Sequence, residues 1–298
     1  MHKAGFVVLV GRPNVGKSTL LNNLLGKKIS IISKVPQTTR FAIRGIFNDE
    51  RGQIIFVDTP GVYLSKKKLS KFLSNRTFTI KDEADLVLYI VDLTRMPHKE
   101  EKEVINQLHN INKPVIMALN KRDLGQFYAD SYIELWKKLT DKKTDPLKYF
   151  ISISALEKRG LEELVDIIFE FLPESPPLYP QDIISDLPEK LLIADIVREK
   201  IFNLTYEEVP HSIAVRVDEI KERKNNLIYI QATILVERQS QRVIIIGKQG
   251  RFLKEIGKQA REELEQNYQK RVYLELWVKV EKGWQNNTLI LKELGYIV

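Results

Sequence analysis

The chain has 298 residues, no cysteine and a formal net charge of +8. This length exceeds one ordinary compact core and predicts two domains. The lack of cysteine excludes a disulfide framework and a thiolate metal site, and no apolar run reaches the ~18 residues that cross a bilayer. The expected location is therefore the cytosol. Because the excess positive charge lies in residues 1–172 and residues 173–298 are balanced, net charge alone does not assign a polyanionic partner to the second half.

Short apolar runs alternate with amphipathic segments over the first half of the chain. The apolar runs are continuous, as in parallel strands buried on both faces. They predict strands at Phe6–Val10, Ile54–Val57, Leu86–Val91, Val115–Leu119 and Tyr149–Ile153, with helices at Ser18–Leu25, Lys99–Ile111, Ser131–Leu139 and Leu161–Phe171. Phe41–Phe47 and Gln53–Val57 flank a turn, so a hairpin should add one antiparallel strand. The pattern indicates a doubly wound, mostly parallel α/β sheet.

A proline-rich segment separates the two halves. Residues 173–180 hold four prolines in eight positions, and such stretches are stiff, extended and poor at joining a core. We therefore expect a first domain at residues 1–172, a linker at 173–180 and a second domain at 181–298.

The pattern changes after the linker. It predicts a helix at Leu187–Leu204, strands at Ile213–Val217 and Leu227–Val236, a helix over Phe252–Leu264, and a strand at Val272–Val280 whose apolar residues alternate. These elements indicate a small α+β domain.

The segment Gly11 to Ser18 reads GRPNVGKS and lies between a predicted strand and a predicted helix. It matches GxxxxGK[ST], in which glycines let backbone N–H groups wrap phosphates at a helix N-terminus. Lys17 can reach the β and γ phosphates, and Ser18 can ligate Mg²⁺. The residues expected to bind the nucleotide here are Gly11, Arg12, Pro13, Asn14, Val15, Gly16, Lys17, Ser18 and Thr19.

A second motif, Asp58-Thr59-Pro60-Gly61, follows the strand Ile54–Val57. An aspartate at the end of a buried strand can hold the Mg²⁺ shell, usually through water, and the N–H of Gly61 can sense the γ phosphate. We expect the nucleotide to be lined here by Asp58, Thr59, Pro60, Gly61 and Val62.

A third motif, Asn120-Lys121-Arg122-Asp123, follows the strand Val115–Leu119. Because a carboxylate only accepts hydrogen bonds, Asp123 can pair with the two adjacent donors of guanine but not with adenine. Lys121 should lie over the base, and Asn120 should tie this loop to the phosphate loop. Ser154, Ala155 and Leu156 follow the next strand and suit a backbone N–H contact to guanine O6.

These motifs, each at the C-terminal end of a strand, resemble the GTPase superfamily, and their details are similar to the translation-factor-related bacterial GTPases. The resemblance implies that a threonine of the segment Val35–Arg40 caps Mg²⁺; we favour Thr39, with Thr38 as the alternative. The expected catalytic group comprises Lys17, Thr39, Gly61 and Asn14, and the metal ligands are Ser18, Thr39 and Asp58.

Val62 stands where Ras-like GTPases carry a catalytic glutamine, and valine cannot orient water. We therefore expect slow unassisted hydrolysis. Related GTPases with an asparagine matching Asn14 use a bound K⁺, so K⁺ is expected as an additional ion beside GTP or GDP and Mg²⁺. The alternative is that Asn14 only stabilises its loop.

The segment Gly247-Lys248-Gln249-Gly250 is a GxxG loop that precedes a predicted helix. Two glycines let a sugar–phosphate backbone approach closely, and the helix presents Arg251, Lys254, Lys258 and Arg261 on one face. The loop resembles that of KH (type II) RNA-binding domains. The β-branched residues Val243–Ile246 locally favour a strand, but the resemblance implies a short helix there. The expected RNA-binding residues are Gly247, Lys248, Gln249, Gly250, Arg251, Lys254 and Lys258.

A GTPase domain followed by a KH domain resembles the Era family of bacterial ribosome-assembly GTPases. The resemblance implies a monomeric GTP-hydrolysing switch in assembly of the 30S subunit and maturation of 16S rRNA, whose 3′ end the KH domain binds. An RNA-binding module with GTP as a slowly turned-over structural ligand is the alternative, and Asp123 argues against an ATP-dependent kinase or ATPase. Lys66, Lys67, Lys68 and Lys71 form a basic patch, which suits peripheral contact with the inner membrane as well as a solvated loop.

Overall fold

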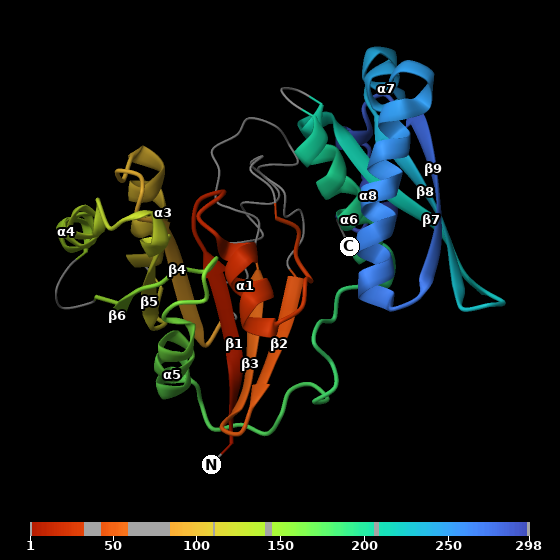
Figure 1. The fold of residues 1–298 in the computed structure, drawn as a ribbon. Helices are drawn as coiled ribbons and strands as arrows, with labels where there is room; N and C mark the ends of the chain where they lie inside the picture. Colours follow the sequence, from red (N-terminus) through yellow and green to blue (C-terminus); the bar gives the residue numbers. More distant parts are fainter. Residues whose placement is uncertain are drawn as a thin grey trace. The chain divides into compact units, whose positions relative to one another are not determined.

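The computed structural model describes residues 2–32, 43–58, 84–109, 111–140, 145–205 and 209–296. The chain forms two compact units (Figure 1). The first unit comprises residues 1–30 and 39–186, and the second comprises residues 31–38 and 187–298. None of the helices in the described ranges is both long and apolar enough to cross a membrane.

The first unit is built on a sheet with the strand order β2-β3-β1-β4-β5-β6. Strand β2 runs antiparallel to β3, and every other neighbouring pair is parallel. This arrangement confirms the mostly parallel α/β sheet and its one antiparallel hairpin. The strands are β1 (Lys3–Val10), β2 (Ile43–Asp49), β3 (Gly52–Asp58), β4 (Leu86–Asp92), β5 (Val115–Asn120) and β6 (Leu147–Ser152).

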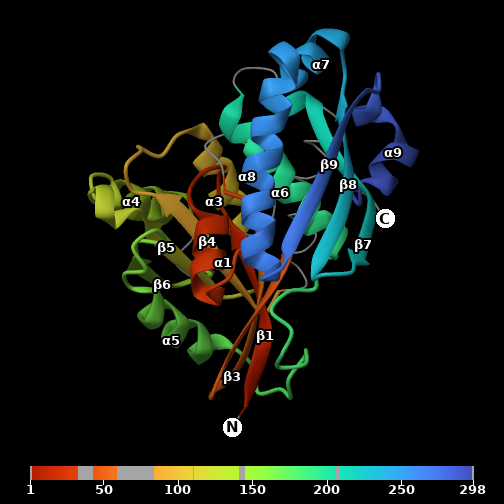
Figure 2. The same ribbon diagram turned by 45° about the vertical axis from the view of Figure 1, so that its right-hand side comes forward.

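Helices cover both faces of this sheet, so its central strands are fully enclosed. All residues of β3, β4 and β5 are buried, which explains why these strands are continuously apolar. Helices α3 and α4 pack through Val104, Leu108 and Trp136 against one face, and α1 and α5 lie on the other (Figures 1 and 2). The helices are α1 (Lys17–Leu25), α3 (Lys99–His109), α4 (Ala129–Leu139) and α5 (Leu161–Phe171).

The proline-rich segment is packed along the first unit, which extends to Asp186 rather than to residue 172. The N–H of Ala4 donates to the carbonyl of Pro173 at 3.2 Å, and the N–H of Ile46 donates to that of Ile184 at 2.8 Å. Prolines lack an N–H but keep an accepting carbonyl, so such a segment can still receive hydrogen bonds from strands. The segment predicted as a linker therefore belongs structurally to the first unit.

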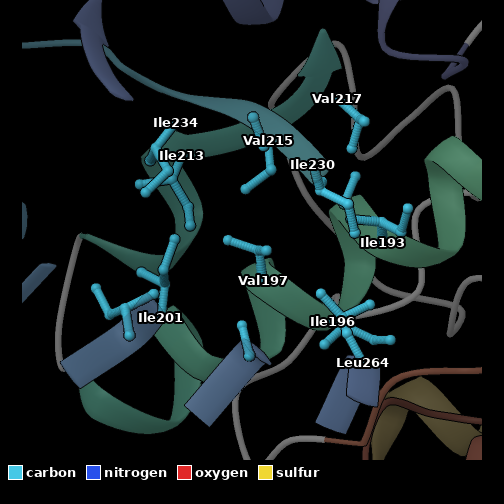
Figure 3. Packing of buried hydrophobic residues seen from close by; sticks show 14 of the residues in the cluster. Ile193, Ile196, Val197, Ile201, Ile213, Val215, Val217, Ile230, Ile234 and Leu264 are labelled. Atoms are coloured by element: carbon cyan, nitrogen blue, oxygen red, sulfur yellow. The ribbon is translucent and has the colours of Figure 1, made fainter. Parts of the chain in front are cut away.

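The second unit has a three-stranded sheet in the order β7-β8-β9, with β7 and β8 antiparallel and β8 and β9 parallel. Its helices pack on one face, where Ile196 and Val197 of α6 meet Val215 of β7, Ile230 of β8 and Leu264 of α8 (Figure 3). The elements are α6 (Glu189–Leu204), β7 (Ile213–Arg223), β8 (Leu227–Val236), α7 (Gln239–Ile246), α8 (Arg251–Tyr268), β9 (Arg271–Val280) and α9 (Thr288–Glu293).

Residues 243–246 lie in the short helix α7, as the family resemblance implied and against their local strand preference. Gln241 caps the start of α7 by accepting a hydrogen bond from the N–H of Arg238 at 2.9 Å, and Ile245 is fully buried in the core. Tertiary packing thus overrides β propensity here. Short 3₁₀ helices complete the described elements at Arg122–Leu124, Pro210–Ser212, Lys248–Gly250 and Trp284–Asn286.

Candidate functional site

The phosphate loop leaves β1 and enters α1 through glycines that no other residue could replace without disturbance. Gly16 has φ 105°, and a Cβ there would meet the Asn120 amide nitrogen at 2.3 Å. A Cβ on Gly11 would meet the carbonyl oxygen of Ile90 at 2.3 Å. Asn14 adopts a left-handed conformation with φ 63°, which asparagine tolerates better than most residues. The backbone therefore forms the tight, N–H-lined turn that a phosphate requires.

Lys17 lies in this loop with its ammonium group folded onto the backbone. It donates to the carbonyls of Gly11 at 3.0 Å and of Arg12 at 2.8 Å. Burial lowers the pKa of Lys17 to about 8, although the nearby carboxyl groups of Asp58 and Glu101 raise it. A phosphate would supply further negative charge to this buried ammonium group and raise its pKa again.

The two expected metal ligands that the structure describes lie together. The hydroxyl of Ser18 donates to Asp58 Oδ2 at 2.7 Å, and that of Ser30 donates to the same oxygen at 2.8 Å. Burial raises the pKa of Asp58, and its other oxygen, Oδ1, has no hydrogen-bond partner within the described ranges. Hydroxyl and carboxylate oxygens are the ligands that Mg²⁺ prefers, so this pair fits a magnesium ion.

Other predicted residues around the phosphates lie outside the described residues. They are Thr38 and Thr39 of the first switch segment, and Thr59, Pro60, Gly61 and Val62 of the second. Their roles stay predictions.

Asn120 joins three parts of the nucleotide site through one buried carboxamide. Its Nδ2 donates to the carbonyl of Val15 in the phosphate loop at 2.7 Å, and its Oδ1 accepts from the N–H of Ala155 at 2.8 Å. The tie between base loop and phosphate loop expected from the sequence is present. A strand end therefore fixes the distance between the base pocket and the phosphate cradle.

Asp123 and Lys121 follow Asn120 and are each held by a side chain from another segment of the first unit. Ser154 donates its hydroxyl to Asp123 Oδ1 at 2.6 Å, which orients the carboxyl group. Lys121 has φ 70° and reaches Asp92 Oδ2 at 2.6 Å. Burial disfavours ionisation of Asp92, but hydrogen bonds from Lys121 and Thr94 outweigh it and lower the pKa. Both residues predicted to read the base are thus held in place by polar partners.

Two of the three backbone N–H groups at residues 154–156 already donate hydrogen bonds within the protein. The N–H of Ser154 donates to Arg159 O at 3.0 Å, and that of Ala155 donates to Asn120 at 2.8 Å. Leu156 is 71% exposed, and the contact of Ser154, Ala155 and Leu156 to guanine O6 stays a prediction.

Sequence motifs missed several residues that hold this site. Ser30 shares the Asp58 oxygen, and Asp92 pairs with Lys121. The sequence does mark Asp92, because it directly follows a predicted buried strand, as Asp58 and Asn120 do. The strand register then places Asp92 directly beside Asn120. Ser30 lies in a loop without periodicity or motif, and no local signal marks it.

The GxxG loop opens α8 and faces solvent. Gly247 and Gly250 have φ 71° and 74°, and Gln249 between them has φ 54°. A Cβ on Gly247 would meet the Cβ of Phe252 at 2.6 Å, whereas one on Gly250 would meet nothing within 4 Å. The loop therefore requires backbone conformations that glycine adopts most easily. The exposed side chains on the loop and the following helix include the polar Gln249 and the basic Lys248, Arg251, Lys254, Lys258 and Arg261, with Glu255, Glu262 and Gln266 also exposed on the helix.

Two aliphatic side chains beside this loop are exposed. Val243 is 61% and Ile244 50% accessible, although Ile245 between them and the loop is fully buried. An apolar surface next to a basic helix N-terminus suits unstacked bases whose phosphates contact the loop. The second unit thus presents the candidate RNA-binding surface expected from the sequence.

Comparisons with known proteins support both assignments. Residues 6–121 match a family described as "50S ribosome-binding GTPase", and residues 208–285 match a KH domain family. GTPase Era of Halothermothrix orenii is 43% identical over 295 residues, covering 99% of each chain. GTPase Era of Carboxydothermus hydrogenoformans is 46% identical over 298 residues, covering 99% of this chain and 98% of the relative.

Two solved structures match the fold over nearly its whole length. Era in complex with MgGDPNP and nucleotides 1506–1542 of 16S ribosomal RNA has a TM-score of 0.93 and 44% identity, with 100% of both chains covered. A variant of Aquifex aeolicus Era bound to GDP and AlF₄⁻ has a TM-score of 0.91 and 45% identity, covering 99% of this chain and 100% of that chain. These likenesses confirm the predicted combination of a GTPase domain and a KH domain.

Proposed function

The chain belongs to the Era family of GTPases, and from this premise we propose that its KH domain binds the single-stranded 3′ end of 16S rRNA. The binding serves maturation of that RNA during assembly of the 30S ribosomal subunit. The observation that carries the proposal is the exposed GxxG loop at the start of α8, with basic side chains after it and aliphatic side chains before it.

The identity of the RNA is inferred from the solved structure of a relative, not from the chemistry of the GxxG loop. That relative holds a fragment of 16S rRNA together with a magnesium-bound GTP analogue. The geometry of this chain supports single-stranded RNA in general, because a GxxG loop clamps about four nucleotides by their backbone.

Binding of an oligonucleotide with the 16S rRNA 3′-end sequence tests this function. In the full chain, Lys248→Ala with Lys254→Ala removes two exposed charges beside the loop, so affinity should fall at least tenfold and the salt dependence should weaken by about two phosphate contacts. Fluorescence anisotropy across a salt series measures both quantities.

Lys279→Ala is the matched control for this experiment. Lys279 is also exposed, but it alternates with Val278 and Val280 of β9, which pack against the core. Its side chain therefore lies on the sheet face opposite to α8, and binding should be unchanged. Equal losses in both proteins would refute the assignment of RNA to the GxxG loop.

Nucleotide state is proposed to control this RNA binding. In the predicted cycle, GTP and Mg²⁺ order the two switch segments, and hydrolysis releases them. Ser18 and Asp58 would hold the metal, with Thr39 as the further ligand. The metal would neutralise charge on the phosphates while Lys17 binds them.

Potassium is proposed as a second cation near Asn14. The support is that Val62 supplies no polar group for water and that Asn14 is half-buried in the phosphate loop. A cation there would offset charge that develops in the transition state. Hydrolysis should be faster in KCl than in NaCl of equal ionic strength, and Asn14→Ala should abolish the difference. Equal rates in the two salts would contradict a potassium site.

The protein is proposed to be a cytoplasmic monomer with peripheral contact at the inner membrane. The support for the membrane contact is the basic cluster Lys66, Lys67, Lys68 and Lys71, which lies outside the described residues. Flotation with anionic vesicles should recover part of the protein, less so at high salt. Recovery that does not depend on anionic lipid would contradict the contact. Light scattering at micromolar concentration tests the monomer.

A further inference from the structure

The side chain of Arg12 extends from the phosphate loop to α3, which no nucleotide-binding motif includes. Its Nε lies 2.6 Å from Glu100 Oε2, and its NH1 lies 3.7 Å from Glu101 Oε1. The Arg12 side chain is 19% exposed and that of Glu101 only 1% exposed. A residue of the phosphate loop is thus paired with two successive carboxyl groups of a neighbouring helix.

Glu101 is also fixed from the sheet. Tyr89 of β4 donates its hydroxyl to Glu101 Oε2, and the tyrosine is itself fully buried with its ring 6.1 Å from that of Trp136. An acidic group on an amphipathic helix is ordinarily placed toward water, because burying a charge costs more than a surface pair returns. Because Glu101 is buried and contacts both Arg12 and Tyr89, it does more than keep the surface of the helix polar.

Arg12 connects these carboxyl groups to the reacting end of the loop. Its own carbonyl accepts the 2.8 Å hydrogen bond from the ammonium group of Lys17. A shift of the Arg12 side chain would move that carbonyl and with it the ammonium group that meets the phosphates. The path from α3 to the phosphate site is Glu100 and Glu101, then Arg12, then Lys17.

We propose that Glu100 and Glu101 are positioning residues of the GTPase site, which hold the phosphate loop in its nucleotide-receiving shape by pairing with Arg12. In this role they act through Arg12 and not by direct contact with the nucleotide. Because the loop cradles the α and β phosphates that GTP and GDP share, loss of the pairing weakens both nucleotides alike. The maximal rate at saturating GTP changes little, since a saturating nucleotide restores the loop.

The test compares nucleotide affinity with the stability of the nucleotide-free protein. Glu100→Gln with Glu101→Gln keeps side-chain size and the acceptor for Tyr89 but removes both charges. The dissociation constants of fluorescent GDP and of a fluorescent GTP analogue should each rise roughly tenfold, as expected for a small displacement of a binding group. Glu103→Gln is the control, because it removes one charge from the same helix at a position outside the cluster, and it should leave both constants unchanged.

A double-mutant cycle with Arg12→Met separates positioning from simple packing. If the carboxyl groups act through Arg12, adding Arg12→Met to the doubly substituted protein causes little further loss, and Arg12→Lys on the native background retains part of the affinity. Unchanged nucleotide affinity would overturn the proposal, even if the melting temperature of the empty protein fell. Losses that add independently of Arg12 would overturn it as well.

Discussion

At the scale of single residues, the site depends on polar side chains that are held by other polar side chains. Asp123 is oriented by Ser154, and Lys121 by Asp92. Asn120 ties the base loop to the phosphate loop. If these residues bind the nucleotide as predicted, such contacts lower the free-energy cost of ordering their side chains on binding.

The choice of guanine is predicted to depend on the carboxyl group of Asp123. Asp123→Asn replaces an acceptor by a donor, so GTP should bind about 10³-fold to 10⁴-fold more weakly, because its N2 amino group then faces an N–H. Xanthosine triphosphate carries a carbonyl at that position, so it should bind the Asp123→Asn protein more tightly than it binds the native protein. Competition against fluorescent GDP measures both.

Asp130→Asn is the control for this change, because Asp130 is exposed in the first turn of α4. It should bind both nucleotides like the native protein. A loss of GTP binding in Asp123→Asn without any gain for xanthosine triphosphate would contradict direct base reading.

At the scale of elements, the sequence predicts the strands and helices better than it predicts what they contact. The buried parallel strands are continuously apolar, and α5 has the predicted bounds Leu161–Phe171. The helix at residues 243–246 could be predicted only from the family resemblance, because their β-branched side chains locally favour a strand. In the fold, the burial of Ile245 in the core outweighs that preference.

The residues of the site that could not be predicted from the sequence depend on contacts between distant parts of the chain. GRPNVGKS, Asp58 and NKRD are contiguous motifs with a known order, so the phosphate and base loops were predicted residue by residue. Ser30, Asp92 and the Glu100–Glu101 pair contribute only through partners far along the chain or on another element. Their chemistry depends on tertiary contacts that no short pattern encodes.

The proline-rich segment, residues 173–180, is predicted to stabilise the first unit through its hydrogen bonds with Gln53. This fully buried side chain accepts from the N–H groups of Leu178 and Tyr179, both at 2.8 Å, and donates to the carbonyl of Tyr179 at 2.9 Å. Gln53→Ala leaves those backbone groups without partners, so the free energy of unfolding of the first unit should fall by about 2–3 kcal/mol. Urea unfolding measures this loss, and proteolysis should cut the segment faster.

The exposed Gln107 of α3 provides the control, since its truncation to alanine should change neither measurement. If Gln53→Ala matched this control, the proline-rich segment would behave as a free linker instead of as part of the unit.

At the scale of the whole molecule, the chain order links the GTPase unit to the KH unit. Ile31 and Ile32 are grouped with the second unit, and the N–H of Ile32 donates to Glu199 Oε2 of α6 at 3.0 Å. The chain that continues to Thr38 and Thr39 therefore starts from the unit that carries the GxxG loop. This connection is the route by which nucleotide state is proposed to affect the RNA-binding unit.

Thermodynamic linkage makes the proposed coupling measurable from either side, because RNA must favour GTP over GDP by the same factor by which GTP favours RNA. The most direct measurement is the affinity of the full chain for a 16S rRNA 3′-end oligonucleotide, with a non-hydrolysable GTP analogue and with GDP. The account predicts roughly tenfold tighter binding with the GTP analogue, within the usual range of coupling. Equal affinity in the two nucleotide states would contradict it.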